Sequence, residues 1–91
     1  MRVRWTTDAA SDLEKIAERI AKDHPDAAIR TARTIYQGLA ALRDFPNRGR
    51  IGRIEGTREL VFASLPYIAV YRVKSETVEV LRIYHAAQDW P

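Results

Sequence analysis

Three residues that can take part in RNA cleavage lie close together late in the chain, in the run Leu81-Arg82-Ile83-Tyr84-His85. Cleavage without a metal requires a base for the 2′-hydroxyl proton, an acid for the leaving oxygen, and cations for the charge on the phosphorane. His85 can act as base or acid, because an unperturbed imidazole titrates near neutral pH. Arg82 and the more distant Arg58 can bind phosphate bidentately, and Tyr84 can stack on a base or donate a proton.

Strand geometry limits how these side chains can act together. In a regular strand Arg82 and Tyr84 point to one face, whereas Leu81, Ile83 and His85 point to the other. A β-bulge would change this alternation, but no residue pattern indicates one. The alternation therefore weakens the case for a nuclease.

Each candidate also has a structural alternative that the sequence leaves open. His85 can cap a backbone carbonyl at the end of a strand. Arg58 can form an ion pair with a carboxylate on a neighbouring strand, and Arg82 can lie over an aromatic ring in a cation–π contact.

A second group of candidates lies in the loop from Pro46 to Thr57. This loop contains three of the four glycines and three arginines, Arg48, Arg50 and Arg53, against a single acidic residue. Loops of this length in small domains are usually functional or mobile. We expect a binding surface made of Arg48, Arg50, Arg53, Arg72 and Trp90. The alternatives are a solvated surface for the loop arginines and simple packing for Trp90.

Two amphipathic helices are predicted to support these residues. A short strand over Arg2–Thr6 is followed by N-cap candidates and then by apolar residues at helical spacing from Ala9 to Ile20. Asp23-His24-Pro25 ends this helix, and Pro25 suits the first turn of the next one. The second apolar stripe runs from Ala28 to Leu42 and ends at Phe45-Pro46. Such a short connection predicts an antiparallel helical hairpin.

Three strands are predicted in the second half, over Glu59–Ser64, Tyr67–Val73 and Thr77–His85. They are rich in Val, Ile, Leu and Tyr, and the connections between them are short enough for hairpin turns. Residues 1–91 are therefore expected to form one α+β domain of order β-α-α-β-β-β, in which an antiparallel sheet carries the helical hairpin on one face.

The amino-acid composition excludes several kinds of site and of protein. The chain has no cysteine, so it has no disulfide framework and no thiolate metal site. Fifteen basic and twelve acidic residues give a net charge of +3, a mild excess whose placement matters more than its size. The sequence has no signal-peptide core and no segment long and apolar enough to span a membrane. We expect a cytoplasmic protein that needs no metal and no cofactor.

The chain resembles the RelE/ParE superfamily of toxins from bacterial type II toxin–antitoxin modules, over nearly its whole length. The resemblance begins with Trp5 before the first helix and with Phe45-Pro46 before the basic glycine loop. It is strongest in three segments, which are Gly56-Thr57-Arg58-Glu59-Leu60, Leu65-Pro66-Tyr67-Ile68 leading to Val70-Tyr71-Arg72-Val73, and Leu81-Arg82-Ile83-Tyr84-His85 with Asp89-Trp90-Pro91.

The resemblance implies a growth-inhibiting toxin of a plasmid-stabilisation module, neutralised by a cognate antitoxin in a hetero-oligomer. It also implies two alternative targets. ParE-like members poison DNA gyrase, whereas RelE-like members are ribosome-dependent mRNA endonucleases. The ending from His85 to Trp90 is more similar to the ParE type. RelE-like nucleases place a catalytic cation on the central strands, where this chain has Ile68 and Val70. A third alternative is a degenerate member that binds its antitoxin but has lost toxicity.

Overall fold

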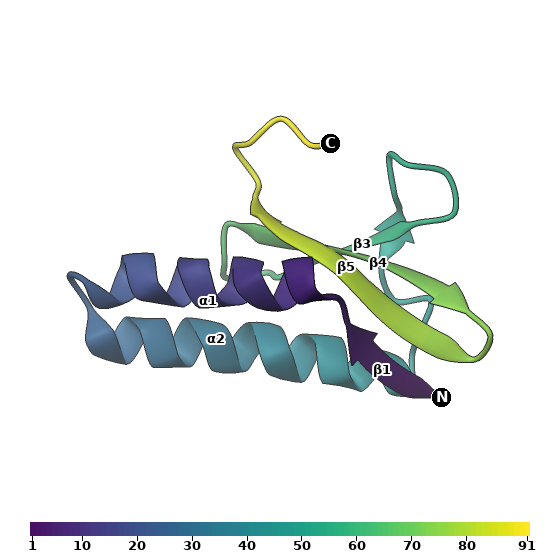
Figure 1. Ribbon diagram of the computed structural model, residues 1–91, viewed down its shortest axis with the longest axis horizontal. Coiled ribbons are helices and arrows are strands. Elements are labelled where there is room, and N and C mark those ends of the chain that lie inside the picture. The colour runs from purple at the N-terminus through teal and green to yellow at the C-terminus, as the bar shows by residue number, and fades with distance from the viewer.

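The computed structural model describes all residues from Met1 to Pro91 and combines two helices with a five-stranded sheet (Figure 1). The elements in chain order are β1 (Arg2–Trp5), α1 (Thr7–Ala21), α2 (Pro25–Ala40), the 3₁₀ turn η1 (Ala41–Arg43), β2 (Arg50–Ile51), β3 (Arg58–Val61), β4 (Tyr67–Lys74) and β5 (Thr77–His85). The predicted α+β architecture and the order of its predicted elements are confirmed.

The strands lie in the order β1-β5-β4-β3-β2. As predicted, β3, β4 and β5 form an antiparallel meander. Two details go beyond the prediction. The helical hairpin returns the chain so that β1 pairs in parallel with β5, which makes the sheet mixed. In addition, Arg50 and Ile51 form the short edge strand β2 against β3.

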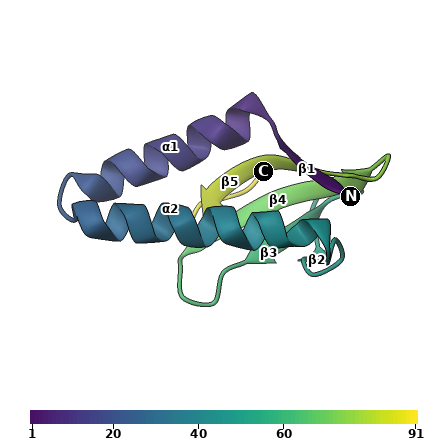
Figure 2. The same ribbon diagram turned by 90° about the horizontal axis from the view of Figure 1, so that it is seen from below.

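The helices form an antiparallel hairpin on one face of the sheet, as the view from below shows (Figure 2). Helix α1 begins after Thr6, whose hydroxyl oxygen accepts a hydrogen bond from the Ala9 N–H at 3.0 Å. The same hydroxyl donates to the Leu81 carbonyl at 2.9 Å and so ties the start of the helix to β5. Pro25 occupies the first turn of α2, where its missing N–H costs no hydrogen bond.

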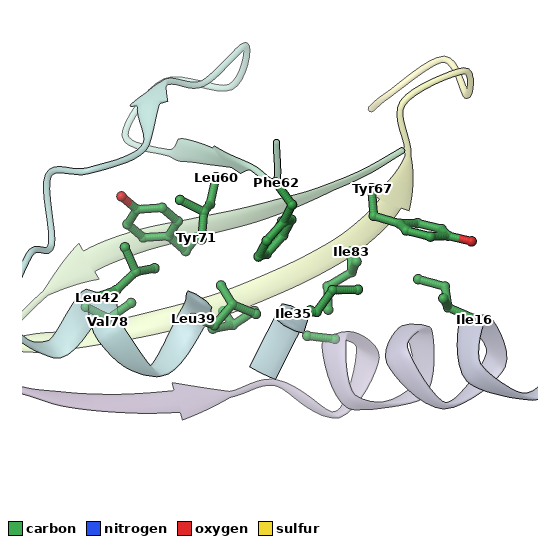
Figure 3. Packing of buried hydrophobic residues seen from close by; sticks show 13 residues of the cluster. Ile16, Ile35, Leu39, Leu42, Leu60, Phe62, Tyr67, Tyr71, Val78 and Ile83 are labelled. Carbon is green, nitrogen blue, oxygen red and sulfur yellow. The ribbon is translucent and has the colours of Figure 1, made fainter. Parts of the chain in front are cut away.

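The main core lies between the helices and the sheet and contains 13 buried apolar residues (Figure 3). Ile35 and Leu39 of α2 are fully buried, as the helical spacing predicted. Leu13 is only partly buried at the margin of the cluster. At the edge of the hairpin, Trp5 stacks on Tyr36 with ring centroids 6.1 Å apart.

Strand β3 is shorter than predicted, because it ends at Val61 rather than at Ser64. The reason is a turn in which the Leu65 N–H donates to the Phe62 carbonyl at 3.2 Å and redirects the chain into β4. Phe62 itself remains buried in the core.

A β-bulge interrupts the pairing of β4 with β5. Tyr71 pairs with Val80 and Val70 pairs with Arg82, so that Leu81 has no partner in the register. Regular alternation placed Leu81 on the same face as Ile83, and this prediction is wrong. Leu81 instead packs with Ile68, Val70 and Tyr84 in a small apolar cluster, whereas Ile83 belongs to the main core. The face of the sheet that carries this small cluster is called the outer face below.

Candidate functional site

A hollow of about 240 Å³ lies between α1, the end of β5 and the C-terminal tail. Its walls include Tyr67, Arg82, Tyr84, His85 and Trp90. The structure therefore gathers three of the four predicted catalytic candidates around one cavity. The fourth candidate, Arg58, is not part of it.

Arg82 is held by a carboxylate that the sequence did not identify as its partner. Its guanidinium donates to both Asp12 oxygens, from Nε at 2.8 Å and from a terminal nitrogen at 3.1 Å. The hydrogen bond to Asp12 raises the pKa of Arg82 above its ordinary value. The guanidinium also lies 5.8 Å from the centre of the Trp90 ring, as the cation–π alternative predicted. Two of the donors that could grip a phosphate are thus already used.

Tyr84 is buried beneath the tail. Trp90 stacks on it with ring centroids 5.3 Å apart and an angle of 18° between the planes. The Tyr84 hydroxyl is buried and has no hydrogen-bond partner. Burial raises the pKa of Tyr84, and the nearby Glu59 charge raises it further. The hydroxyl is therefore held in its neutral form, covered by an indole ring.

His85 acts as a cap at the end of β5. Its Nδ1 accepts a hydrogen bond from the Ala87 N–H at 3.0 Å, so it caps an amide rather than the carbonyl that the structural alternative named. This bond requires an unprotonated Nδ1. The ring also packs edge-on against Tyr67, with centroids 5.5 Å apart. Since Nδ1 is the acceptor of the bond from Ala87, Nε2 is the only ring nitrogen of His85 that is left to exchange a proton with a ligand.

Arg58 lies at a distance from this hollow. It pairs with Tyr71 in the register, whereas His85 pairs with Tyr67, four residues away on the same strand. That offset is about 13 Å along the strand, and β4 lies between the two residues. Arg58 donates to the Gly49 carbonyl at 2.8 Å and takes part in none of the ion pairs, so the carboxylate contact named as its structural alternative is not formed.

The loop arginines have individual partners. Arg50 donates twice to the buried Glu59 carboxylate, at 3.0 and 2.9 Å. Arg53 donates to the Trp90 carbonyl at 2.7 Å and so fastens the tail to the loop. Arg48 lies over the Phe45 ring at 4.7 Å.

The remaining binding candidates also make contacts within the chain. Arg72 donates to Glu79 at 2.6 Å, and Trp90 covers Tyr84 as described. The predicted binding set therefore does not form one free basic patch. Whether these residues contact a partner stays a prediction.

Sequence reasoning missed two carboxylates that organise the site, Asp12 and Glu59. Glu59 accepts from Arg50 and from the Arg53 backbone N–H, and its side chain is only 2 % exposed. A signal was present for Glu59, since an acidic residue inside an apolar strand must find a donor when it is buried. For Asp12 no such signal exists, because an acidic residue on a helix usually faces solvent.

The structure contains no cluster of three or more His, Cys, Asp or Glu side chains suited to a metal ion. None of its helices is both long and apolar enough to cross a membrane.

The sequence and the fold of this chain are both similar to those of known proteins. Residues 3–90 match the family model described as "ParE toxin of type II toxin-antitoxin system, parDE". The chain is 49 % identical over 90 residues to a Sinorhizobium fredii protein named "Putative toxin Y4kP", covering 99 % of this chain and 93 % of that protein. It is 37 % identical over 86 residues to Toxin RelE2 of Caulobacter vibrioides, covering 94 % and 96 % of the two chains.

A solved structure titled "Chromosomal ParDE TA system from P. aeruginosa" contains a chain with the same fold. It superposes with a TM-score of 0.87 at 30 % identity, covering 93 % of this chain and 95 % of that one. The sequence motifs, the helical hairpin on the sheet and these matches lead to one assignment. The chain belongs to the family of ParE toxins of type II toxin–antitoxin systems, within the RelE/ParE superfamily.

Proposed function

We propose that this toxin inhibits growth in the ParE-like manner, by binding DNA gyrase in the cytoplasm, and that it does not cut RNA. The observation that carries the proposal is the separation of the groups that cleavage would need. Arg58 is offset from His85 by about 13 Å along β4. A base and a phosphate-binding cation must both reach one scissile phosphate, within hydrogen-bonding distance.

Two of the three candidates that line the hollow are also poorly arranged for cleavage. Arg82 and His85 belong to opposite faces of β5, because the bulge at Leu81 precedes both of them and leaves their alternation intact. Arg82 is neutralised by Asp12, and His85 already accepts a hydrogen bond through Nδ1. A toxin that acts by binding needs no such convergence, since a few anchoring side chains dominate an interface.

We further propose that a cognate antitoxin neutralises this toxin within a plasmid-stabilisation module, as the similarity to the solved ParDE toxin–antitoxin system of P. aeruginosa suggests. The outward side of α2 offers a suitable surface. Ile29 and Tyr36 are 57 % and 60 % exposed there, and Arg30 and Arg33 are exposed on the same helix. Exposed apolar side chains flanked by cations fit an amphipathic, acidic segment. Association should be slower at high salt, and a rate independent of salt would exclude the electrostatic contribution.

The decisive test compares two variants in a growth assay with a host that lacks the antitoxin. His85→Ala should remain toxic, because a strand-end cap contributes little to a binding surface. The double variant Arg48→Ala/Arg53→Ala should lose more toxicity. Arg50 is left intact, because removing it would leave the buried Glu59 without its main donor. Circular dichroism should show that both variants are folded.

The mode of action can be measured directly. Purified wild-type toxin should inhibit supercoiling by gyrase and should induce a DNA-damage reporter in cells. It should leave ribosome-bound message intact in a purified translation mixture. A folded but inactive His85→Ala beside a fully toxic double variant would contradict the proposal.

One observation favours a second candidate, a RelE-like ribosome-dependent mRNA endonuclease. Arg82, Tyr84 and His85 line a single hollow, and the chain is 37 % identical to Toxin RelE2. In that case His85→Ala should reduce cleavage by about 10²–10⁴, the usual contribution of a general acid or base. A chain that neither inhibits gyrase nor cuts message, yet binds its antitoxin, would be a degenerate member.

A further inference from the structure

Four cationic side chains surround a second hollow, at the other end of the sheet from His85. The hollow has a volume of about 300 Å³ and lies beside the turn between β4 and β5. Arg2 and Arg4 reach it from β1, and Arg72 and Lys74 reach it from β4. These two strands are separated only by β5, so their outer-face side chains converge over it.

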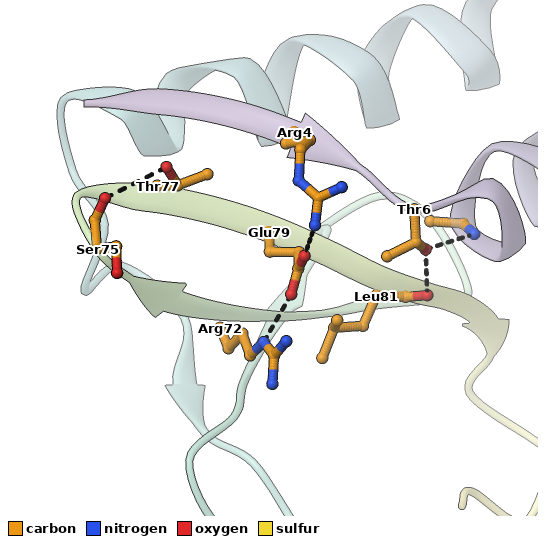
Figure 4. A network of polar contacts seen from close by, with 8 residues as sticks. Arg4, Thr6, Arg72, Ser75, Thr77, Glu79 and Leu81 are labelled. Atoms are coloured by element: carbon orange, nitrogen blue, oxygen red, sulfur yellow. Dashed lines mark hydrogen bonds and ion pairs between the residues drawn. The ribbon is translucent and has the colours of Figure 1, made fainter.

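A buried carboxylate on β5 organises two of these cations. The Glu79 side chain is 12 % exposed and accepts a hydrogen bond from Arg72 Nε at 2.6 Å. Its second oxygen accepts from a terminal nitrogen of Arg4 (Figure 4). Each guanidinium therefore uses one nitrogen for Glu79 and keeps its other N–H donors for a ligand. Glu79 fixes both arginines without occupying them fully.

The other two cations have no acidic partner. Neither Arg2 nor Lys74 takes part in any of the four ion pairs of the structure. Four cations around one carboxylate give the hollow a net charge of +3. The whole chain has 15 basic and 12 acidic residues, so the remainder, with 11 of each, is electrically balanced. The net charge of the protein is thus equal to the charge gathered here.

The chemistry of the walls favours phosphate over a protein side chain. None of the residues that line the hollow is hydrophobic. Protein partners are usually anchored by apolar and aromatic side chains, whereas nucleic-acid interfaces are polar and strongly positive. Ser75 and Thr77 add hydroxyl groups to the wall, and hydroxyls commonly donate to phosphate oxygens.

We propose that this hollow binds the phosphate backbone of a nucleic acid, independently of base sequence. Arg2 and Lys74 supply free charge, and Glu79 presents Arg4 and Arg72 in fixed orientations. This surface is distinct from the His85 hollow, and the inference does not depend on which target the toxin inhibits. Like charges held together repel one another in the free protein, and a bound polyanion relieves that repulsion.

The test measures the binding of a short fluorescein-labelled DNA duplex by fluorescence anisotropy over a range of salt concentrations. Each phosphate contact contributes about −0.9 to the slope of log affinity against log salt concentration. Arg2→Ala/Lys74→Ala should weaken binding and make the slope shallower by about 2. Both side chains are exposed and unpaired, so the variant should keep its circular dichroism spectrum.

The matched control is Arg30→Ala/Arg33→Ala, which removes the same charge from exposed positions on α2. It should leave the slope nearly unchanged. Equal losses in the two double variants would show a diffuse field rather than a site and would overturn the proposal. An unchanged slope in Arg2→Ala/Lys74→Ala would overturn it as well.

Two competitors identify the source of the anion. Inorganic phosphate at matched ionic strength should not displace the duplex, because a single anion makes only part of the contacts. A glutamate-rich peptide of the same charge should compete only weakly. Efficient displacement by phosphate would assign the site to free phosphate, and efficient displacement by the peptide would assign it to an acidic protein segment. Either result contradicts a backbone-binding site.

Discussion

Arg82 donates two hydrogen bonds to the Asp12 carboxylate, at 2.8 and 3.1 Å, although 70 residues separate the two in sequence. The same carboxylate accepts the Ile83 backbone N–H at 2.9 Å. Strand β1 pairs with β5 only as far as Val80, and no other strand lies beside β5 on that side after this residue. Asp12 therefore substitutes for a strand there and joins α1 to the end of β5.

Replacing Asp12 by alanine should lower the free energy of unfolding by about 1–3 kcal/mol. The change removes the charged hydrogen bonds from Arg82 and leaves the buried Ile83 N–H without a partner. Arg82→Ala should cost less, because the Arg82 side chain is 42 % exposed and its charge is screened by water. Urea unfolding measures both. Asp23→Ala, an exposed position, is the control and should change stability by less than about 0.5 kcal/mol.

Leu39→Ala should destabilise the protein by about 2–5 kcal/mol, since Leu39 is fully buried in the main core. This is a large share of the stability of a small domain. Ile29→Ala removes a side chain of similar size that is 57 % exposed and should cost far less. Thermal melts of the two variants give the comparison. Equal melting temperatures would show that the assigned face of α2 is wrong.

Arg50→Ala should reduce stability by about 1–3 kcal/mol, although the Arg50 side chain is 54 % exposed. The reason lies in its partner, because Glu59 is only 2 % exposed and loses two of its three hydrogen bonds. Arg50→Ala combined with Glu59→Gln should recover part of the loss, since the buried charge is then absent. No recovery in this double variant would argue that Arg50 acts through packing alone.

Tyr84→Phe should leave stability unchanged or raise it at neutral pH, because the lost hydroxyl is buried without a partner. A second effect follows from the raised pKa of Tyr84, whose ordinary value is 10.0. The unfolded chain loses this proton at lower pH than the folded one, so stability falls as pH rises from about 10 towards the folded pKa. Denaturant unfolding at alkaline pH should show a smaller fall in Tyr84→Phe than in the parent. Tyr36→Phe, at an exposed position, provides the matched control.

The features of the fold that depend on local periodicity could be predicted from the sequence. The apolar stripes of the helices, the proline that begins α2 and the three-stranded meander each follow from spacing within one segment. Residues 78–83 depart from strict alternation, because Val80 and Leu81 are adjacent apolar residues, but a strand buried on both faces shows the same departure. The pattern therefore does not by itself identify the bulge at Leu81. The bulge depends on how β4 and β5 pair, which is a tertiary property.

The candidate site was predicted in part. The sequence identified Arg82, Tyr84 and His85, which share a hollow, but it grouped Arg58 with them. It also treated the loop arginines as one basic surface, whereas Arg50, Arg53 and Arg48 are held by a carboxylate, a carbonyl and a ring, respectively. Charge counts cannot reveal such contacts, since a carbonyl and an aromatic ring carry no formal charge and the pairing of Arg50 with Glu59 depends on how β2 and β3 align.

The parallel pairing of β1 with β5 affects how the protein is made. The ribosome produces β1 first among the strands and β5 last, yet these two lie side by side with β5 in the interior of the sheet. Until β5 has been synthesised, β1 therefore has no strand to pair with, and one edge of β4 has unpaired backbone N–H and C=O groups. Contacts of such long sequence separation form late. A nascent chain that stops before Thr77 lacks both the His85 hollow and the basic hollow, so an interrupted message yields no complete toxin.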